Sequence, residues 1–314
     1  MRVFVAGATG AIGRQLVPQL VAAGHQVTAT TRSPAKVAGL RAAGADAIVL
    51  DGLDGAAVGA AVAEAEPEVV VHEMTAIPAN ISFRRFDQTF GPTNKLRTAG
   101  VDHLLAAATA QGVARFVVQS FAGWPYAPSG DGLRTEDDPL LTHPPAAMRA
   151  SLDAIRHLEH AVTSAPLAGL VLRYGGLYGP GSSDALVPML KRRQVPVIGD
   201  GAGVWSFVHV ADAAGATVAA VQGGGPGTYN VVDDEPAPVA EWLPVMARAV
   251  GAGAPFRVPA WIGRLAAGEA GLYLMTKVRG CSNAKAKREL GWQLHWPTWR
   301  EGFASGLNRA YPSS

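Results

Sequence analysis

The sequence has very little cysteine, and this excludes a disulfide framework. Cys281 is the one cysteine among 314 residues. It has no neighbouring ligand or base candidates, so we interpret it as a small core or surface residue and assign no metal site. No basic leader or apolar signal core precedes the first strand-like segment. We therefore expect a cytoplasmic protein.

Long hydrophobic runs and charge of one sign are also missing. The longest apolar stretches, such as 56–62, fall well below the roughly 20 residues of a membrane span. A net charge of +2, with only the short basic run 191–193, predicts no binding to nucleic acid. Since 48% of the residues are hydrophobic, the chain can form a large core in one or two domains.

Glycine is abundant, and three glycines at the beginning of the chain form a motif. Residues 1–5 have the pattern of a buried strand, and an apolar helical stripe follows residue 13. A Gly-x-x-Gly-x-x-Gly turn between a strand and a helix is typical of a dinucleotide site, where backbone amides receive the pyrophosphate. The residues predicted to form this site are Gly7, Thr9, Gly10, Ala11, Ile12 and Gly13.

The second predicted strand, 26–31, ends without the acidic residue that would hold the ribose of NAD. Arg32 and Lys36 follow it instead, and they favour the 2′-phosphate of NADP(H) over NAD(H). The alternative is that Arg32 stacks on adenine and Lys36 is only solvated. Asp51, after the third strand, is placed to accept from the adenine amino group.

The next strands predict where a substrate lies. His72 ends an apolar run, so a core histidine is favoured over a catalytic one. Met74 and Thr75 continue this strand and are expected to pass along the cofactor. A fifth strand, 115–119, leads into Ser120 and a loop that carries aromatic residues. In an open parallel sheet this edge holds the chemistry.

These segments, taken in order, resemble the extended short-chain dehydrogenases/reductases, the family of NAD-dependent epimerases and dehydratases. The resemblance covers nearly the whole chain. It rests on the glycine turn, Asp51, the segments 71–72, 172–181, 199–201, 207–212 and 229–231, and Leu290-Gly291-Trp292.

The resemblance implies a doubly wound α/β Rossmann fold with a small mixed α/β substrate domain. The expected boundaries are 1–174 for the Rossmann domain, to which 206–232 returns, and 175–205 with 233–314 for the cap. Residues expected at the cofactor on this ground are Met148, Tyr174, Gly176 and Leu177.

The family's catalytic Tyr-x-x-x-Lys pair is not present at its expected place. Met148 and Leu152 stand at the two positions, and no tyrosine or lysine occurs between Pro128 and Tyr174. The chain is therefore identified as an atypical member. We take Tyr126 as the first candidate for a substitute proton donor, with Ser120 as a hydrogen-bond partner of the substrate; the alternative for Tyr126 is an aromatic anchor.

Two further departures concern the substrate. Gly176 and Trp205 stand where relatives that act on nucleotide sugars tend to carry diphosphate-binding asparagine and arginine. This exchange favours an apolar, non-nucleotide substrate. The residues expected to line its site, each of which can alternatively fill core, are Trp124, Tyr178, Trp205 and Phe207.

The sequence thus predicts an NADPH-dependent reductase of a small hydrophobic carbonyl or enone compound. One alternative is an inactive NADP-binding sensor. Another is a cyclase, dehydratase or epimerase in which Glu73, Asp184 or His143 moves the proton. A homodimer through the helix that begins near residue 146 is a further expectation.

Overall fold

The centre of the molecule is a seven-stranded sheet in which every pair of neighbours is parallel. The computed structural model describes residues 1–78, 81–183 and 186–307. The strand order is β3-β2-β1-β4-β5-β6-β11. The strands are β1 (Arg2–Ala6), β2 (Gln26–Thr31), β3 (Asp46–Val49), β4 (Val69–His72), β5 (Arg115–Phe121), β6 (Ala168–Tyr174) and β11 (Gly227–Val231).

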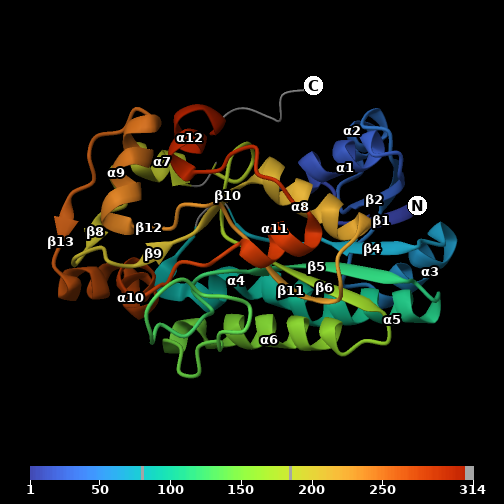
Figure 1. The fold of residues 1–314 in the computed structure, drawn as a ribbon, viewed down its shortest axis with the longest axis horizontal. Helices are drawn as coiled ribbons and strands as arrows, with labels where there is room; N and C mark the ends of the chain where they lie inside the picture. The colour runs from blue at the N-terminus through green and yellow to red at the C-terminus, as the bar shows by residue number, and fades with distance from the viewer. Residues whose placement is uncertain (79–80, 184–185, 308–314) are drawn as a thin grey trace.

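Helices cover both faces of this sheet (Figure 1). The first layer contains α1 (Gly13–Ala22), α2 (Val37–Ala42), α8 (Val210–Gln222) and α11 (Ala284–Leu290). The second contains α3 (Gly55–Ala65), α4 (Phe86–Lys95), α5 (Val101–Ala110) and α6 (Arg149–Thr163), and a π-helical turn, Leu96–Gly100, joins α4 to α5.

The strands are apolar on both faces because each face packs against a helix layer. Val3 and Val5 of β1 belong to the core beneath α1 and α8, whereas Phe4 between them belongs to the core beneath α3 and α5. This period-two division is expected of a buried parallel strand. It explains why the first residues read as a continuous hydrophobic run.

The remaining segments form a smaller part beside one end of the sheet (Figure 1). Three two-stranded pairs, β7–β10, β8–β13 and β9–β12, lie there among four helices. The elements are β7 (Gly176–Tyr178), α7 (Leu186–Lys191), β8 (Val197–Ile198), β9 (Val204–Trp205), β10 (Phe207–His209), β12 (Ala237–Pro238), α9 (Val239–Ala249), β13 (Arg257–Val258), α10 (Ala260–Thr276) and α12 (Trp299–Glu301).

The structure confirms the predicted doubly wound parallel sheet and the return of the chain to it. Segment 227–231 pairs with β6, as the sequence predicts for this region. The fifth strand is longer than predicted, since it continues through Ser120 to Phe121. Helix α4 is not predicted from the sequence. The assignment of a separate cap domain stays an interpretation.

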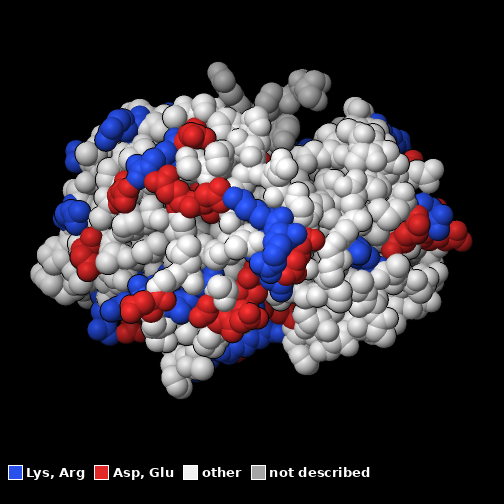
Figure 2. Space-filling view, in the orientation of Figure 1, with Lys and Arg blue, Asp and Glu red and all other residues white. Residues whose placement is uncertain are grey.

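The surface of the molecule carries charged side chains of both signs. Acidic and basic side chains are interspersed over the face shown in Figure 2. Within the described ranges, no helix is both long enough and apolar enough to cross a membrane. Those ranges also contain no group of three or more His, Cys, Asp or Glu side chains that could hold a metal ion.

Candidate functional site

The glycine turn forms a compact cradle between β1 and α1. Gly7 has φ of +95°, and a Cβ placed there would lie 2.5 Å from the carbonyl carbon of Glu73. A Cβ at Gly13 would meet the Gly7 carbonyl oxygen at 2.5 Å. No side chain caps α1 at Ile12. The Arg14 and Gln15 amides donate to carbonyls of the turn itself, whereas the amides of residues 11–13 have no acceptor among the described residues and are left for a ligand. This arrangement fits an anionic phosphate group.

Other residues of the turn have mixed exposure. Thr9, Gly10 and Ala11 are partly exposed, whereas the side chain of Ile12 belongs to the core. The Thr9 Oγ1 atom lies 3.3 Å from Thr31 Oγ1 at the end of β2. The end of β2 therefore lies against the glycine turn.

The residues predicted to determine the preference for NADP(H) over NAD(H) lie on the surface, just after the end of β2. Arg32 and Lys36 are both exposed, and neither makes a salt bridge within the described ranges. Asp51 is exposed after β3, where its Oδ1 accepts from the Leu53 amide at 3.1 Å. These side chains are open to a ligand that lies across the strand ends.

The segment that leaves β4 passes directly beside the glycine turn. The Glu73 amide donates to the Ala6 carbonyl at 2.8 Å, which extends the pairing of β4 with β1. Met74 and Thr75 follow and are half-buried. His72 is fully buried, its Nε2 lies 3.1 Å from the Leu96 carbonyl oxygen, and burial lowers its pKa to about 4. The interpretation of His72 as a core histidine is confirmed.

Glu73 and Tyr174 form a buried polar pair beneath this edge. The Tyr174 hydroxyl donates to Glu73 Oε1 at 2.8 Å and lies 2.7 Å from Thr217 Oγ1 on α8. Burial raises the pKa of Glu73 to about 8. The Tyr174 hydroxyl thus lies between Glu73 and α8, and the predicted contact of Tyr174 with the cofactor stays a prediction.

A small pocket, with a cavity volume of about 20 Å³, lies at the carboxyl ends of β5 and β6, on the same edge of the sheet as the glycine turn. Trp124 and Trp205, which the sequence predicts at the substrate, line this pocket together with Gly176, which the sequence predicts at the cofactor. The complete lining is Phe121, Ala122, Gly123, Trp124, Gly176, Trp205, Ser206, Leu274 and Val278. None of these side chains titrates near neutral pH, and apart from the Ser206 hydroxyl the described side chains of the lining are apolar or aromatic.

Two predicted lining residues lie elsewhere. Tyr178 is 1% exposed and packs edge-on against His209 and Phe303. Phe207 is also buried and packs against Trp242. Both fill the core of the C-terminal part, which is the alternative that the sequence left open.

Sequence reasoning missed the C-terminal wall of the pocket. Leu274 of α10 and Val278 just beyond it contribute this wall. They lie about 150 residues beyond the β5 loop, and an apolar helix position carries no signal that distinguishes a pocket wall from core. The indole Nε1 of Trp205 donates to the Leu274 carbonyl at 2.8 Å and fixes this wall.

Met148 and Leu152 pack in the core next to Trp124. Met148 and Leu152 are fully buried in one apolar cluster with Trp124. Helix α6 begins after Met148, where Asp87 accepts from the Ala150 amide at 2.9 Å. The described side chains at positions 148 and 152 therefore supply packing and no proton.

Gly176 and Leu177, both predicted at the cofactor, follow β6 in β7. Gly176 lies in the pocket wall, where a Cβ would approach the Phe207 ring to 3.1 Å. The Leu177 side chain packs against the core beneath α1 and α8. Because the Leu177 side chain is packed in this core, a contact of Leu177 with a cofactor would have to come from its backbone.

The two candidate catalytic hydroxyls belong to a closed network beside the pocket. Ser120 Oγ donates to Glu159 Oε1 at 2.6 Å, and Glu159 also accepts two hydrogen bonds from Arg173. The Tyr126 hydroxyl donates to Asn230 Oδ1 at 2.7 Å and accepts from Arg173 at 2.6 Å.

These contacts favour a structural role for Ser120 and Tyr126, and their predicted catalytic roles stay predictions. Tyr126 is 1% exposed and does not line the pocket, and burial raises the pKa of its phenol far above the usual value. Ser120 is 3% exposed. Both hydroxyls hold the end of β5 to β6 and α6, so the anchor interpretation of Tyr126 agrees with the geometry.

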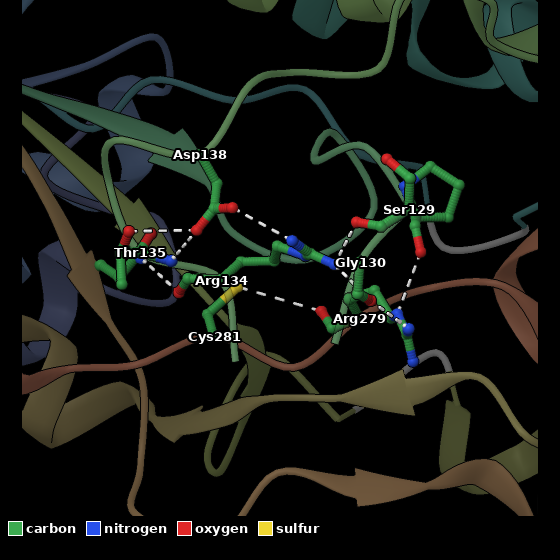
Figure 3. A network of polar contacts seen from close by, with 9 residues as sticks. Ser129, Gly130, Arg134, Thr135, Asp138, Arg279 and Cys281 are labelled. Carbon is green, nitrogen blue, oxygen red and sulfur yellow. Dashed lines mark hydrogen bonds and ion pairs between the residues drawn. The ribbon is translucent and has the colours of Figure 1, made fainter. Parts of the chain in front are cut away.

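A second network of polar contacts joins the loop after Trp124 to the segment around Arg279 and Cys281 (Figure 3). The Arg134 guanidinium donates to Asp138 and to the carbonyls of Ser129 and Gly130. Its backbone forms an isolated bridge with Cys281. The loop after Trp124 is thereby fastened to the segment after Val278.

The remaining candidates for proton transfer differ in placement. His143 is exposed, and Glu73 is buried away from the pocket lining. Asp184 lies outside the described residues.

Comparison with known proteins agrees with this geometry. Residues 3–231 match the profile of the NAD dependent epimerase/dehydratase family. A 3-diazoavenalumate denitrifying reductase of a Streptomyces species is 45% identical over 310 residues, covering 96% of this chain and 99% of that protein. A 2-alkyl-3-oxoalkanoate reductase of Stenotrophomonas maltophilia is 28% identical over 80% of this chain and 76% of that protein.

Solved structures share the whole fold. The UDP-glucose 4-epimerase of Thermus thermophilus, in complex with NAD, superposes with a TM-score of 0.73 at 26% identity and 98% coverage of both chains. The sheet order, the glycine turn and the family profile lead to the same assignment. The chain belongs to the NAD-dependent epimerase/dehydratase family of extended short-chain dehydrogenases/reductases.

Proposed function

We propose that this chain binds a nicotinamide dinucleotide and reduces a small, hydrophobic, non-nucleotide compound. The observation that carries the proposal is the apolar pocket of Trp124 and Trp205 at the same sheet edge as the glycine turn. Two relatives that are named reductases support a reduction, and the NAD complex of the Thermus epimerase supports the cofactor class.

The residues present fit the dinucleotide. A side chain at Gly7 or Gly13 would collide with the backbone of Glu73 or of the turn itself, so the compact turn that is expected to receive the pyrophosphate requires glycine there. The N-terminus of α1 favours the charge of this group. Arg32 and Lys36 would hold a 2′-phosphate, and Asp51 the adenine. When bound in its reduced form, the dinucleotide supplies a hydride.

The lack of a titratable group in the pocket bears on the substrate class. Reduction of a carbonyl or enone leaves an anion that must be protonated, and the described lining offers no acid for this step. Replacement of an aromatic diazonium group by hydrogen forms one C–H bond, breaks one C–N bond and expels N₂. It consumes a hydride and no proton.

We therefore propose an aromatic diazo compound as the preferred substrate class. The name of the Streptomyces relative points to a diazo compound that loses nitrogen. A hydrophobic carbonyl or enone is the alternative, for which bulk water would supply the proton. A homodimer through α6 and a cytoplasmic location stay predictions.

The test is turnover with defined acceptors. We expect purified protein to oxidise NADPH with an aromatic diazonium salt, to release N₂ in equal amount, and to place deuterium from labelled NADPH on the ring.

The Tyr126→Phe variant tests the role of the phenol. We expect its turnover number to fall less than tenfold, because the phenol does not line the pocket. Loss of a general acid would lower turnover roughly a hundredfold or more.

Other outcomes distinguish the alternatives. Turnover of enones alone would replace the diazo assignment by the carbonyl one. Dinucleotide binding without any turnover would favour a sensor. A hundredfold loss in Tyr126→Phe would restore this tyrosine as the proton donor.

The cofactor preference has a separate test at the end of β2. Arg32→Ala should weaken NADPH binding about 10- to 100-fold, since a charge-assisted hydrogen bond contributes about 1.5–3 kcal/mol, and should leave NADH binding unchanged. Calorimetric titration measures both. Arg41→Ala, at another exposed arginine on α2, is the matched control. An equal effect on NADPH and NADH would contradict the 2′-phosphate contact.

A further inference from the structure

Arg97 is a buried cation without a partner. Arg97 is only 8% exposed, and its Nε atom has no hydrogen-bond partner. Across residues 1–78, 81–183 and 186–307, its guanidinium forms no hydrogen bond and no ion pair. Buried charges are normally paired because desolvation is costly, so an unpaired one calls for a ligand.

The position of Arg97 in the fold is at the expected ligand edge. It lies in the π-helical turn between α4 and α5. The preceding residue, Leu96, contacts His72 at the end of β4 through its carbonyl oxygen. One turn earlier, Thr93 Oγ1 accepts from the Ala76 amide at 3.1 Å. Arg97 thus lies beside the segment that leaves β4 next to the glycine turn.

The nearby carboxylate does not neutralise Arg97. Burial lowers the pKa of Arg97 to about 10, while the charge of Glu159 on α6 raises it. Both Glu159 oxygens already accept from Arg173, and Oε1 also accepts from Ser120. Three hydrogen bonds from other residues thus occupy the Glu159 carboxylate, and none of the hydrogen bonds to it comes from Arg97.

We propose that Arg97 holds the nicotinamide-ribose half of the dinucleotide by donating to its oxygen atoms. The proposal rests on the proposed function. The choice of this half follows from the strand order, in which β2 and β3 lie on one side of β1, where the adenosine is expected, and β4 and β5 lie on the other. Arg97 belongs to the second side.

The test combines stability with binding in Arg97→Met, which removes the charge and keeps an unbranched apolar stem. A cation kept for a ligand should stabilise only the bound form. We expect the free variant to melt at the same temperature as wild type or higher, and to bind NADPH about 10- to 100-fold more weakly. Binding of 2′,5′-ADP, which lacks the nicotinamide half, should not change. Arg97→Gln is the second variant, in case the first fails to fold.

The outcomes separate this proposal from the function itself. Unchanged NADPH affinity in the variants, with binding by wild type, would overturn the role of Arg97 alone. Equal weakening of NADPH and 2′,5′-ADP would also overturn it, since this would show a general disturbance. No NADPH binding by wild type would overturn the proposed function, and the Arg97 contact with it.

Discussion

Arg173→Met is expected to destabilise the protein by about 3–5 kcal/mol, the usual cost of breaking a buried ion pair from one side. Arg173 and Glu159 have side chains only 7% and 10% exposed, with Nη2 and Oε2 2.6 Å apart. Loss of the guanidinium leaves a buried carboxylate with Ser120 as its one remaining donor. The Tyr126 hydroxyl loses a donor at the same time.

Urea unfolding at neutral pH measures this effect. Arg264→Met is the matched control, because its pair with Glu269 is 62% and 54% exposed, and exposed pairs contribute at most about 1 kcal/mol. The double variant Arg173→Met/Glu159→Met should recover part of the loss, since it removes both charges. A loss below about 1 kcal/mol in Arg173→Met would show that water reaches the pair.

The fold was predictable from the sequence because its signals are local. The glycine turn requires Gly7 at positive φ and Gly13 in close contact with Gly7, and both requirements are visible as glycines between a strand and a helix. The sheet order then follows from alternating strands and helices. Helix α4 was missed because Pro92 and a polar composition hide its period.

The candidate site was predictable only as a region. Trp124 lines the pocket, and the sequence indicates this edge because Trp124 follows a strand that ends there. Ser120 was placed at the same edge, but the strand continues through it, and its side chain faces α6 and Glu159. Whether a residue at the end of a strand faces the site depends on where the strand ends, and the sequence leaves this uncertain by about two residues.

Polar residues that depend on tertiary contacts could not be assigned. Arg97 lies among ordinary helix residues, and only the packing of α6 shows that it is buried without a partner. Glu73 follows the apolar run of β4, and only α8 supplies the Thr217 hydroxyl beside its partner Tyr174. For both residues, the environment of the side chain depends on segments that are distant in the sequence. Such contacts cannot be inferred from the neighbouring residues alone.

Glu73 provides the second large expected effect, which depends on pH. Its folded-state pKa of about 8 exceeds the ordinary value of 4.5 because the carboxyl is buried, and the Tyr174 hydroxyl only partly opposes this. Between these values the folded protein retains a proton that the unfolded chain releases. The contribution of the Glu73 carboxyl to the free energy of unfolding is therefore fully present below about pH 4.5, and it is lost as the pH rises to about 8.

Glu73→Gln should remove this loss, because the amide stays neutral and can still accept from Tyr174. We expect the free energy of unfolding of the variant, relative to wild type, to rise by about 1 kcal/mol per pH unit from pH 6.5 and to level off above about pH 8. Urea unfolding at pH 6.5, 7.5 and 8.5 measures it, and this window lies above the lowered pKa of His72.

Asp233, whose pKa burial also raises to about 8, contributes equally to both proteins and cancels in the difference. Glu64→Gln, on the exposed side of α3, is the control. A difference that stays constant with pH would mean that Glu73 is ionised in the folded protein, and that a cation or water reaches the carboxyl beneath the glycine turn.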